Sequence, residues 1–359
     1  MAQSPIEMIK TRVRELRPYS LRAERTRVKL NQNENPWDAP TEIKLETMKR
    51  LSDRAWSRYP DFSPQHLHQR LAEFSGWKPE GIIAGNGSNE LIQALLMVTV
   101  EKGKRVLISE PTFALYRQIT TVLDGEVVTV SLTPDLTYDR AALSGAVAAM
   151  KPDLTIICSP NNPTGCVMEC PDLAVLLQTV PGLVVVDEAY FEFSGQSVLP
   201  LLAQHSNLVV LRTFSKAMAM AGLRVGYLLA APEIVQEVAK AVLPYNLNII
   251  SQTAAEVAIE MFATHLQPLV RAICAERDRL YTELLVLPGL IPVLSQANFM
   301  LVRSRVKPRY IFEELLKREI LVRDVSQYPF LQNHFRISVG TPEENDLLLA
   351  ALRDILKEQ

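Results

Sequence analysis

Cysteine is scarce in this sequence, and its spacing argues against a structural role for the thiols. The 359 residues contain four cysteines, Cys158, Cys166, Cys170 and Cys274, and no two of them form a CxxC pair. Zinc sites usually pair their ligands more tightly and in two clusters, and no histidine lies near Cys166 and Cys170. We therefore expect four reduced thiols and no metal site.

A large net charge and a long hydrophobic run are also missing. Lysine and arginine total 38 against 40 aspartates and glutamates, so the formal net charge of -2 offers no basic surface to a nucleic acid. The longest apolar stretch, around Leu91 to Val100, contains Gln93, whereas a membrane span needs about 18 apolar residues or more. Charges spread through Met1 to Arg14 leave no apolar run for a signal peptide. We expect a cytoplasmic protein that binds neither nucleic acid nor membrane.

Short runs of valine, isoleucine and leucine recur between residues 81 and 229. Several are almost continuously apolar, which is typical of strands buried on both faces of a sheet. Helical patterns lie between many of them, for example Asn89–Val100 and Asp139–Met150. This alternation predicts an α/β fold with a mainly parallel seven-stranded sheet flanked by helices. The predicted strands are Gly81–Ala84, Arg105–Ser109, Glu126–Ser131, Leu154–Cys158, Leu183–Asp187, Leu208–Thr213 and Val225–Leu229.

The pattern changes after about residue 245. A long helical stretch, Ser251–Leu285, is followed by shorter strands and two more helices, which predicts a smaller α+β domain at the C-terminus. The elements after it are strands Asn298–Val302, Leu321–Val322 and Phe335–Val339 and helices Arg309–Arg318 and Pro342–Lys357. The predicted division is an N-terminal segment, 1–45, that joins the small domain, a large domain, 46–260, and a small domain, 261–359.

A glycine-rich turn, GNGSNE, follows the first predicted strand and precedes a helix. Ligands of open α/β sheets bind at the carboxyl ends of the strands, so this turn lies where a ligand would bind. Its free backbone N–H groups suit a phosphate, but Ser88 is also an ordinary helix cap, and both interpretations stay open. Glu90 occupies the third glycine position of the dinucleotide fingerprint, and the sequence contains no GxxxxGK[ST] motif.

Charged side chains follow two later strands. Asp187 ends the run LVVVD, and a carboxylate at the tip of a buried strand is costly unless it meets a cation or a positive ring nitrogen. Lys216 follows the next strand, close after Thr213 and Ser215, and Arg224 lies eight residues further on. A lysine desolvated among cations has a lowered pKa and becomes a nucleophile for carbonyls. This set predicts pyridoxal phosphate as cofactor, because that molecule combines a ring nitrogen, an aldehyde and a phosphate.

The ordered motifs resemble those of fold-type I pyridoxal-phosphate aminotransferases and, within that class, the histidinol-phosphate aminotransferase family. They run from NENP (Asn33–Pro36) through NNPTG, DEAY and TFSKAMAMAGLRVGY to FRISVGTPEEN (Phe335–Asn345), so the resemblance covers essentially the whole chain. It implies the fold-type I large domain, a transaminase activity, and a homodimer whose active site lies at the subunit interface.

The resemblance also implies a role for each motif residue. Lys216 would be the Schiff-base lysine, and Asp187 would pair with the pyridine N–H and keep the ring electron-poor. Tyr190, the third expected catalytic residue, would hydrogen-bond the ring O3′ together with Asn162, and Phe113 would stack on the ring. The phosphate would be held by Thr213, Ser215, Arg224, the backbone of Ser88 and Asn89, and Tyr59 from the neighbouring subunit.

Arginines and tyrosines in further matching positions imply a phosphate ester as substrate. Arg336 matches the arginine that grips the substrate's anionic group, and Arg323 matches a second one; two guanidinium groups suit a dianion. The reaction implied is transfer of the amino group of L-histidinol phosphate to 2-oxoglutarate, which gives imidazole-acetol phosphate and L-glutamate in histidine biosynthesis. The expected substrate-binding residues are Tyr19, Asn35, Tyr245, Arg323 and Arg336.

Three other functions stay open from the sequence alone. An aromatic amino-acid aminotransferase and a threonine-phosphate decarboxylase share the same scaffold, and only the decarboxylase releases CO2. A non-catalytic sensor that binds pyridoxal phosphate would need an appended DNA-binding domain. The roughly 30 residues ahead of the first motif are too few for a helix-turn-helix domain.

Overall fold

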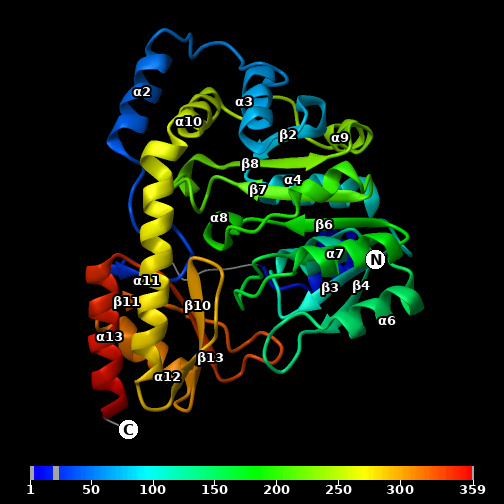
Figure 1. Cartoon of the computed structure of the whole chain (residues 1–359). Coiled ribbons are helices and arrows are strands. Elements are labelled where there is room, and N and C mark those ends of the chain that lie inside the picture. The colour runs from blue at the N-terminus through cyan, green and yellow to red at the C-terminus, as the bar shows by residue number, and fades with distance from the viewer. Residues whose placement is uncertain (1–3, 19–23, 358–359) are drawn as a thin grey trace.

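A seven-stranded sheet forms the centre of the computed structural model, which describes residues 4–18 and 24–357 (Figure 1). The strand order is β2-β8-β7-β6-β5-β3-β4, and the neighbouring pairs are parallel except for the two that involve β8. The predicted α/β fold with a mainly parallel seven-stranded sheet is therefore confirmed. The strands are β2 (Ile82–Asn86), β3 (Arg105–Glu110), β4 (Glu126–Ser131), β5 (Leu154–Cys158), β6 (Leu183–Asp187), β7 (Leu208–Thr213) and β8 (Val225–Ala230).

Strand β2 runs two residues further than predicted. Gly85 and Asn86 pair with residues of β8, so only Gly87 separates the strand from helix α4 (Ser88–Thr99). Gly87 has φ +77°, in the left-handed region that favours glycine. The chain thus turns from strand to helix within one residue, at the carboxyl edge of the sheet.

Side chains of the central strands alternate between two apolar layers. Val184 and Val186 of β6 belong to the core under one face, whereas Val185 belongs to the core under the other. Because both faces are covered, such strands have nearly continuous apolar sequences. Helices α3 (Gln65–Ser75), α6 (Arg140–Met150), α7 (Cys170–Thr179) and α10 (Ile249–Glu260) line the first core, and α4, α5 (Leu115–Val122) and α9 (Pro232–Ala239) line the second.

A smaller antiparallel sheet follows in the C-terminal part of the chain, in the order β12-β13-β10-β9. Strand β1 (Val28–Lys29), from near the N-terminus, pairs in parallel with β11 (Ile320–Leu321) beside it. The division at residues 45 and 260 stays a prediction. The elements are β9 (Leu290–Pro292), β10 (Phe299–Ser304), β12 (Arg323–Asp324), β13 (His334–Ser338), α12 (Pro308–Lys317) and α13 (Pro342–Lys357).

The stretch Ser251–Leu285, predicted to be largely helical, forms two α-helices joined by a π-helical turn. Helix α10 ends at Glu260, a π-helical turn occupies Phe262–Leu266 (η5), and α11 runs over Gln267–Leu285 beside the small sheet (Figure 1). Pro268 lies in the first turn of α11 and has no backbone N–H, so a regular α-helical ladder cannot continue through it. The stretch is thus largely helical, as predicted, with one irregular turn between two α-helices.

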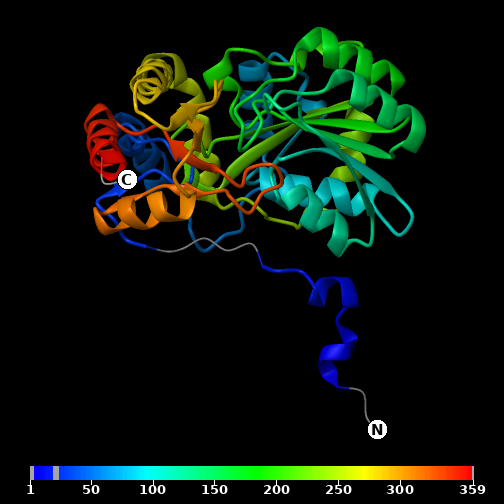
Figure 2. The same cartoon turned by 90° about the horizontal axis from the view of Figure 1, so that it is seen from below.

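The first helical turns, η1 (Pro5–Met8) and α1 (Thr11–Arg14), extend away from the body of the molecule (Figure 2). Lys10 Nζ joins this segment to the end of α5, because it lies 2.7 Å from Asp124 Oδ2. Across residues 4–18 and 24–357, no helix has the length and apolar character needed to cross a membrane. The remaining elements are α2 (Thr41–Ser52), α8 (Phe191–Ser194), η2 (Pro79–Gly81), η3 (Leu199–Ala203) and η4 (Ala221–Leu223).

Candidate active site

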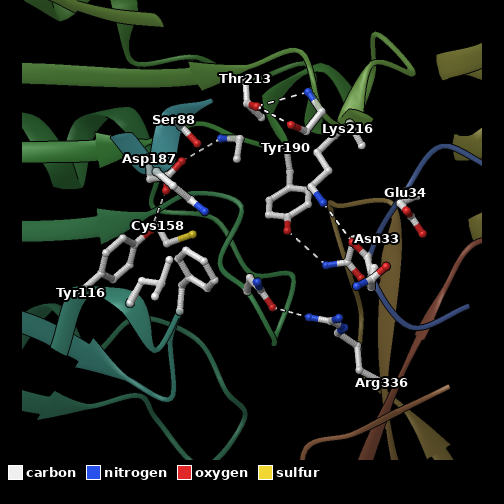
Figure 3. A pocket seen from close by; sticks show the side chains of 18 of the residues that line it. Asn33, Glu34, Ser88, Tyr116, Cys158, Asp187, Tyr190, Thr213, Lys216 and Arg336 are labelled. Atoms are coloured by element: carbon white, nitrogen blue, oxygen red, sulfur yellow. Dashed lines mark hydrogen bonds between the residues drawn. The ribbon is translucent and has the colours of Figure 1, made fainter. Parts of the chain in front are cut away.

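A cavity of about 330 Å³ lies where the carboxyl ends of β5, β6 and β7 face the small sheet (Figure 3). The loop 31–34, which follows β1, closes one side of it. Residues from both sheets and from this loop thus meet around one space. The predicted site residues that line the cavity are Ser88, Asn89, Phe113, Asn162, Asp187, Tyr190, Thr213, Ser215, Lys216, Arg224 and Arg336.

One end of the cavity is a cradle for an anion. Helix α4 begins at Ser88, so its first backbone N–H groups have no partner within the helix. A Cβ added at Gly87 would press on the Arg224 guanidinium, and the φ of +77° at this position also favours glycine. Arg224 Nη1 donates to Ser215 Oγ at 3.2 Å, and Thr213 Oγ1 donates to the same oxygen at 3.1 Å. A helix N-terminus, a guanidinium and two hydroxyls together suit a phosphate group.

Lys216 reaches into the cavity from the segment after β7. Its Nζ donates to the Gln32 carbonyl oxygen at 2.9 Å and lies 5.8 Å from the centroid of the Tyr190 ring. Burial, with a smaller effect of the Arg336 charge, lowers the pKa of Lys216 to about 8. The amine therefore exchanges its proton near neutral pH, which is what a nucleophilic or proton-transferring lysine requires.

Asp187 ends β6 and lies fully inside the site. Its Oδ2 accepts a hydrogen bond from the Tyr116 hydroxyl at 2.7 Å, and its Oδ1 accepts one from the Ala189 backbone N–H at 3.1 Å. Burial raises the pKa of Asp187 to about 6, and both hydrogen bonds oppose that rise. A buried carboxylate of this kind gains most from a cationic group placed against it.

Arg336 crosses from β13 of the small sheet to the turn that follows β5. Its Nη1 donates to Asn162 Oδ1 at 2.5 Å, and its Nη2 donates to the Asn31 carbonyl oxygen at 2.8 Å. The guanidinium also lies 5.2 Å from the Phe299 ring centroid, so the ring supports its position. The group faces the cavity and can engage an anionic ligand through two N–H donors.

Four predicted residues lie outside this cavity. Tyr59 is 81% exposed and stacks on Tyr245 with ring centroids 4.6 Å apart, on a different part of the surface. Arg323 lines a neighbouring hollow that shares Phe113 with the cavity. Asn35 instead holds its own loop, because its amide donates to the Ala217 carbonyl and its Oδ1 accepts from the Trp37 N–H. Their predicted roles stay predictions.

The fifth residue, Tyr19, lies outside the described residues. Its proposed contribution to a phosphate pocket also stays a prediction.

Among the cavity residues that the predicted site lacked, two make hydrogen bonds to predicted catalytic residues. Asn33 Nδ2 donates to the Tyr190 hydroxyl at 3.1 Å, and Tyr116, fully buried in the first turn of α5, donates to Asp187. The NENP motif contains both Asn33 and Asn35, and its sequence does not say which of them faces the site. The three-residue spacing of Phe113 and Tyr116 was a usable signal, since it places two aromatic rings on one side of a helical turn.

Fold and site together define the class of protein. A mostly parallel sheet carrying a desolvated lysine, a buried aspartate and an anion cradle at its carboxyl edge is the arrangement of a fold-type I pyridoxal-phosphate enzyme. The family model of class I and II aminotransferases matches residues 25–352, and the chain belongs to that family.

Within this family, the chain is similar to several histidinol-phosphate aminotransferases. The chain is 42% identical over 345 residues to Histidinol-phosphate aminotransferase 1 of Carboxydothermus hydrogenoformans, which covers 95% of this chain and 97% of that one. It is 36% identical over 354 residues to the histidinol-phosphate aminotransferase of Chlorobium phaeobacteroides, with 98% of each covered. The solved histidinol-phosphate aminotransferase of Sinorhizobium meliloti, in complex with pyridoxal-5'-phosphate, superimposes with a TM-score of 0.85 at 27% identity, covering 93% of this chain and 92% of that one.

The cavity fits pyridoxal phosphate, which is the cofactor of this family. The cradle at Gly87 and Arg224 matches the phosphate, the buried Asp187 carboxylate matches a protonated ring nitrogen, and the Lys216 amine matches the aldehyde. No group of three or more metal-ligating side chains occurs within the described part of the chain. The four cysteines are free.

Proposed function

We propose that this chain is a pyridoxal-phosphate-dependent transaminase acting on L-histidinol phosphate and 2-oxoglutarate, with imidazole-acetol phosphate and L-glutamate as products. The observation that carries the proposal is one cavity that unites Lys216, Asp187 and an anion cradle in a chain so similar to proteins of that name. The cofactor, when bound, supplies an electron-poor ring that stabilises negative charge at the substrate α-carbon.

The residues around the cavity would hold the cofactor at three points. Arg224, Ser215, Thr213 and the first N–H groups of α4 would hold its phosphate, and Lys216 would hold its aldehyde carbon covalently. Asp187 would accept a hydrogen bond from the ring nitrogen and keep it protonated, as a buried carboxylate stabilises a cation beside it. Tyr190 and Asn162 would hydrogen-bond the ring oxygen, and Phe113 would stack against the face of the ring.

Lys216 would also move the reacting proton. Its Nζ, with a pKa of about 8, would take a proton from the α-carbon of the bound substrate as a base and would donate it again as an acid later in the same half-reaction. The Gln32 carbonyl, 2.9 Å from Nζ, orients the amine toward the cavity. Tyr190 is itself fixed by Asn33, so the two groups next to the reacting centre are both held by the loop 31–34.

Arg336 and Arg323 would recognise the anionic end of the substrate. Arg336 faces the cavity, and the two arginines are directly opposite each other on β13 and β12. Two guanidinium groups on adjacent strands suit a phosphate dianion, and they can also receive the carboxylates of glutamate and 2-oxoglutarate. The same two arginines would therefore bind the anionic group of the substrate in both half-reactions.

The first prediction concerns substrate choice. We expect kcat/KM for L-histidinol phosphate to exceed that for phenylalanine and for aspartate by at least about 100-fold, because each charge-assisted contact to a phosphate is worth about 1.5–3 kcal/mol. Initial rates with 2-oxoglutarate as the common acceptor measure this. L-histidinol, which lacks the phosphate, is the matched control and should react as poorly as the amino acids.

The same assay separates the rival activities. Equal rates on phenylalanine would contradict the proposal and favour an aromatic aminotransferase. Release of CO2 from threonine phosphate without formation of glutamate would favour the decarboxylase instead.

We also propose a homodimer in which Tyr59 completes the partner's site. The support is that Tyr59 is exposed, lies outside the cavity of its own chain and has an aromatic neighbour, Tyr245, to hold it. An exposed aromatic pair of this kind is typical of a protein–protein contact. The four free cysteines agree with the expectation of a cytoplasmic protein, which stays a prediction.

The second prediction tests this shared site with mixed subunits. Lys216→Ala and Tyr59→Ala subunits are each impaired alone, but a hybrid dimer contains one site with intact Lys216 and an intact Tyr59 from the partner. Random mixing should therefore recover about a quarter of the wild-type sites. Activity after unfolding and refolding the mixture measures this; a mixture no more active than the average of its two components would contradict the proposal.

A further inference from the structure

Tyr116 lies behind Asp187, on the side away from Lys216 (Figure 3). Its side chain is fully buried, and its hydroxyl donates to Asp187 Oδ2 at 2.7 Å, a short distance typical of a hydrogen bond to an ionised carboxylate. Burial keeps the pKa of Tyr116 well above its ordinary value, so the phenol stays protonated and can only donate to the carboxylate. The Tyr116 hydroxyl therefore donates a hydrogen bond that stabilises the charged form of Asp187.

The two hydrogen bonds on Asp187 divide its oxygens. Tyr116 holds Oδ2 and the Ala189 N–H holds Oδ1, so the carboxylate cannot rotate without breaking both. Cys158, opposite Asp187 on the neighbouring strand β5, directs its Sγ to the Pro160 carbonyl at 3.4 Å. Among the described residues, Tyr116 is thus the side chain that donates a hydrogen bond to Asp187.

Tyr116 is itself fixed by the helix that carries it. It occupies the first turn of α5, and its ring meets the Phe113 ring edge-on with centroids 5.6 Å apart. The start of α5 and the residue just before its N-cap therefore supply both the donor behind the acid and an aromatic ring for the cavity wall. This links the placement of Asp187 to the placement of the residue expected to stack on the cofactor.

We propose that Tyr116 is a positioning residue that keeps Asp187 ionised and oriented as the acceptor for the ring nitrogen of the cofactor. The inference rests on the proposed function, because it deepens the role assigned there to Asp187. Without the phenol, the buried carboxylate loses its strongest partner and favours its neutral form, which pairs poorly with a protonated ring nitrogen.

The test compares two cofactors on full-length protein freed of bound cofactor. One is pyridoxal phosphate, and the other is its 1-deaza analogue, in which CH replaces the ring nitrogen; affinity is measured by absorbance titration. Wild-type protein should prefer pyridoxal phosphate, and Tyr116→Phe should reduce that preference about 10-fold or more, the usual effect of a hydrogen bond to a charged group. A merely structural role would weaken both cofactors equally and leave the preference unchanged.

Tyr138→Phe is the matched control. Tyr138 is also a buried tyrosine, but its hydroxyl donates to the Cys158 carbonyl oxygen at 2.6 Å, at the end of the neighbouring strand β5, and not to Asp187. This variant should keep the wild-type preference. If Tyr116→Phe fails to fold, the comparison is repeated with Tyr116→His, which retains a donor, and Tyr116→Leu, which has none; only the leucine variant should lose the preference.

The possible outcomes distinguish a failure of the role of Tyr116 from a failure of the role of Asp187. Tyr116→Phe with an unchanged preference overturns the role of Tyr116 and leaves that of Asp187 intact. A wild-type protein with equal affinity for both cofactors overturns the role of Asp187, and the inference falls with it.

Discussion

Replacing Lys216 by alanine is expected to lower the rate of transamination of histidinol phosphate by about 10⁴-fold or more. The amine is assigned two tasks, covalent attachment of the cofactor and proton transfer at the α-carbon, and proton transfer alone is worth up to about 10⁴-fold. No other described lysine lines the cavity, so the structure offers no substitute amine. Single-turnover measurement of the variant with saturating cofactor gives the value.

Lys240→Ala is the control for this variant. Lys240 is exposed at the end of α9, where it pairs with Glu237, and its removal should leave the rate unchanged. Substantial transaminase activity in Lys216→Ala would contradict the assigned mechanism. Partial recovery with added ethylamine would instead support it, because a free amine can replace the missing base.

Asp187→Asn is expected to have the second largest effect, a loss of about 10³-fold in kcat. The substitution keeps the size of the side chain and removes the charge that keeps the ring nitrogen protonated. Removing one such preorganised electrostatic contact in a buried site typically costs 10²- to 10³-fold. Steady-state rates and the cofactor's absorbance spectrum, recorded together, distinguish a chemical defect from simple loss of cofactor.

The matched control is Asp172→Asn. Asp172 lies on α7, outside the cavity, and its carboxylate is 2.7 Å from Arg140 Nη1. It should change kcat by less than twofold. A fully loaded Asp187→Asn enzyme with wild-type kcat would show that the ring nitrogen needs no carboxylate.

The sheet could be predicted because its signal is local. The strand Leu208–Thr213 is buried on both faces and begins with four apolar residues, and that run is visible without knowledge of its neighbours. The proximity of the residues that follow β6 and β7 could also be predicted from the strand pattern. Once the strands are parallel, their carboxyl ends share an edge, and Asp187 and Lys216 must lie near one another.

Features that depend on distant contacts could not be predicted in this way. Asn33 enters the site because its backbone N–H bonds to Ser338 Oγ, more than 300 positions away, and this orients its amide toward Tyr190. The exposed position of Tyr59 likewise depends on packing against Tyr245, on a loop after α9. The irregular turn before α11 is a different case, because it goes with a local signal, the proline Pro268 in the first turn of that helix.

Borohydride reduction of the purified holoenzyme, followed by proteolysis and peptide mass mapping, tests the central assignment most directly. We expect a single peptide containing Lys216 that carries the mass of the reduced cofactor, and no such peptide in protein first treated with excess substrate. Attachment to a different lysine, or no attachment at all, would contradict the assignment of this cavity as the active site.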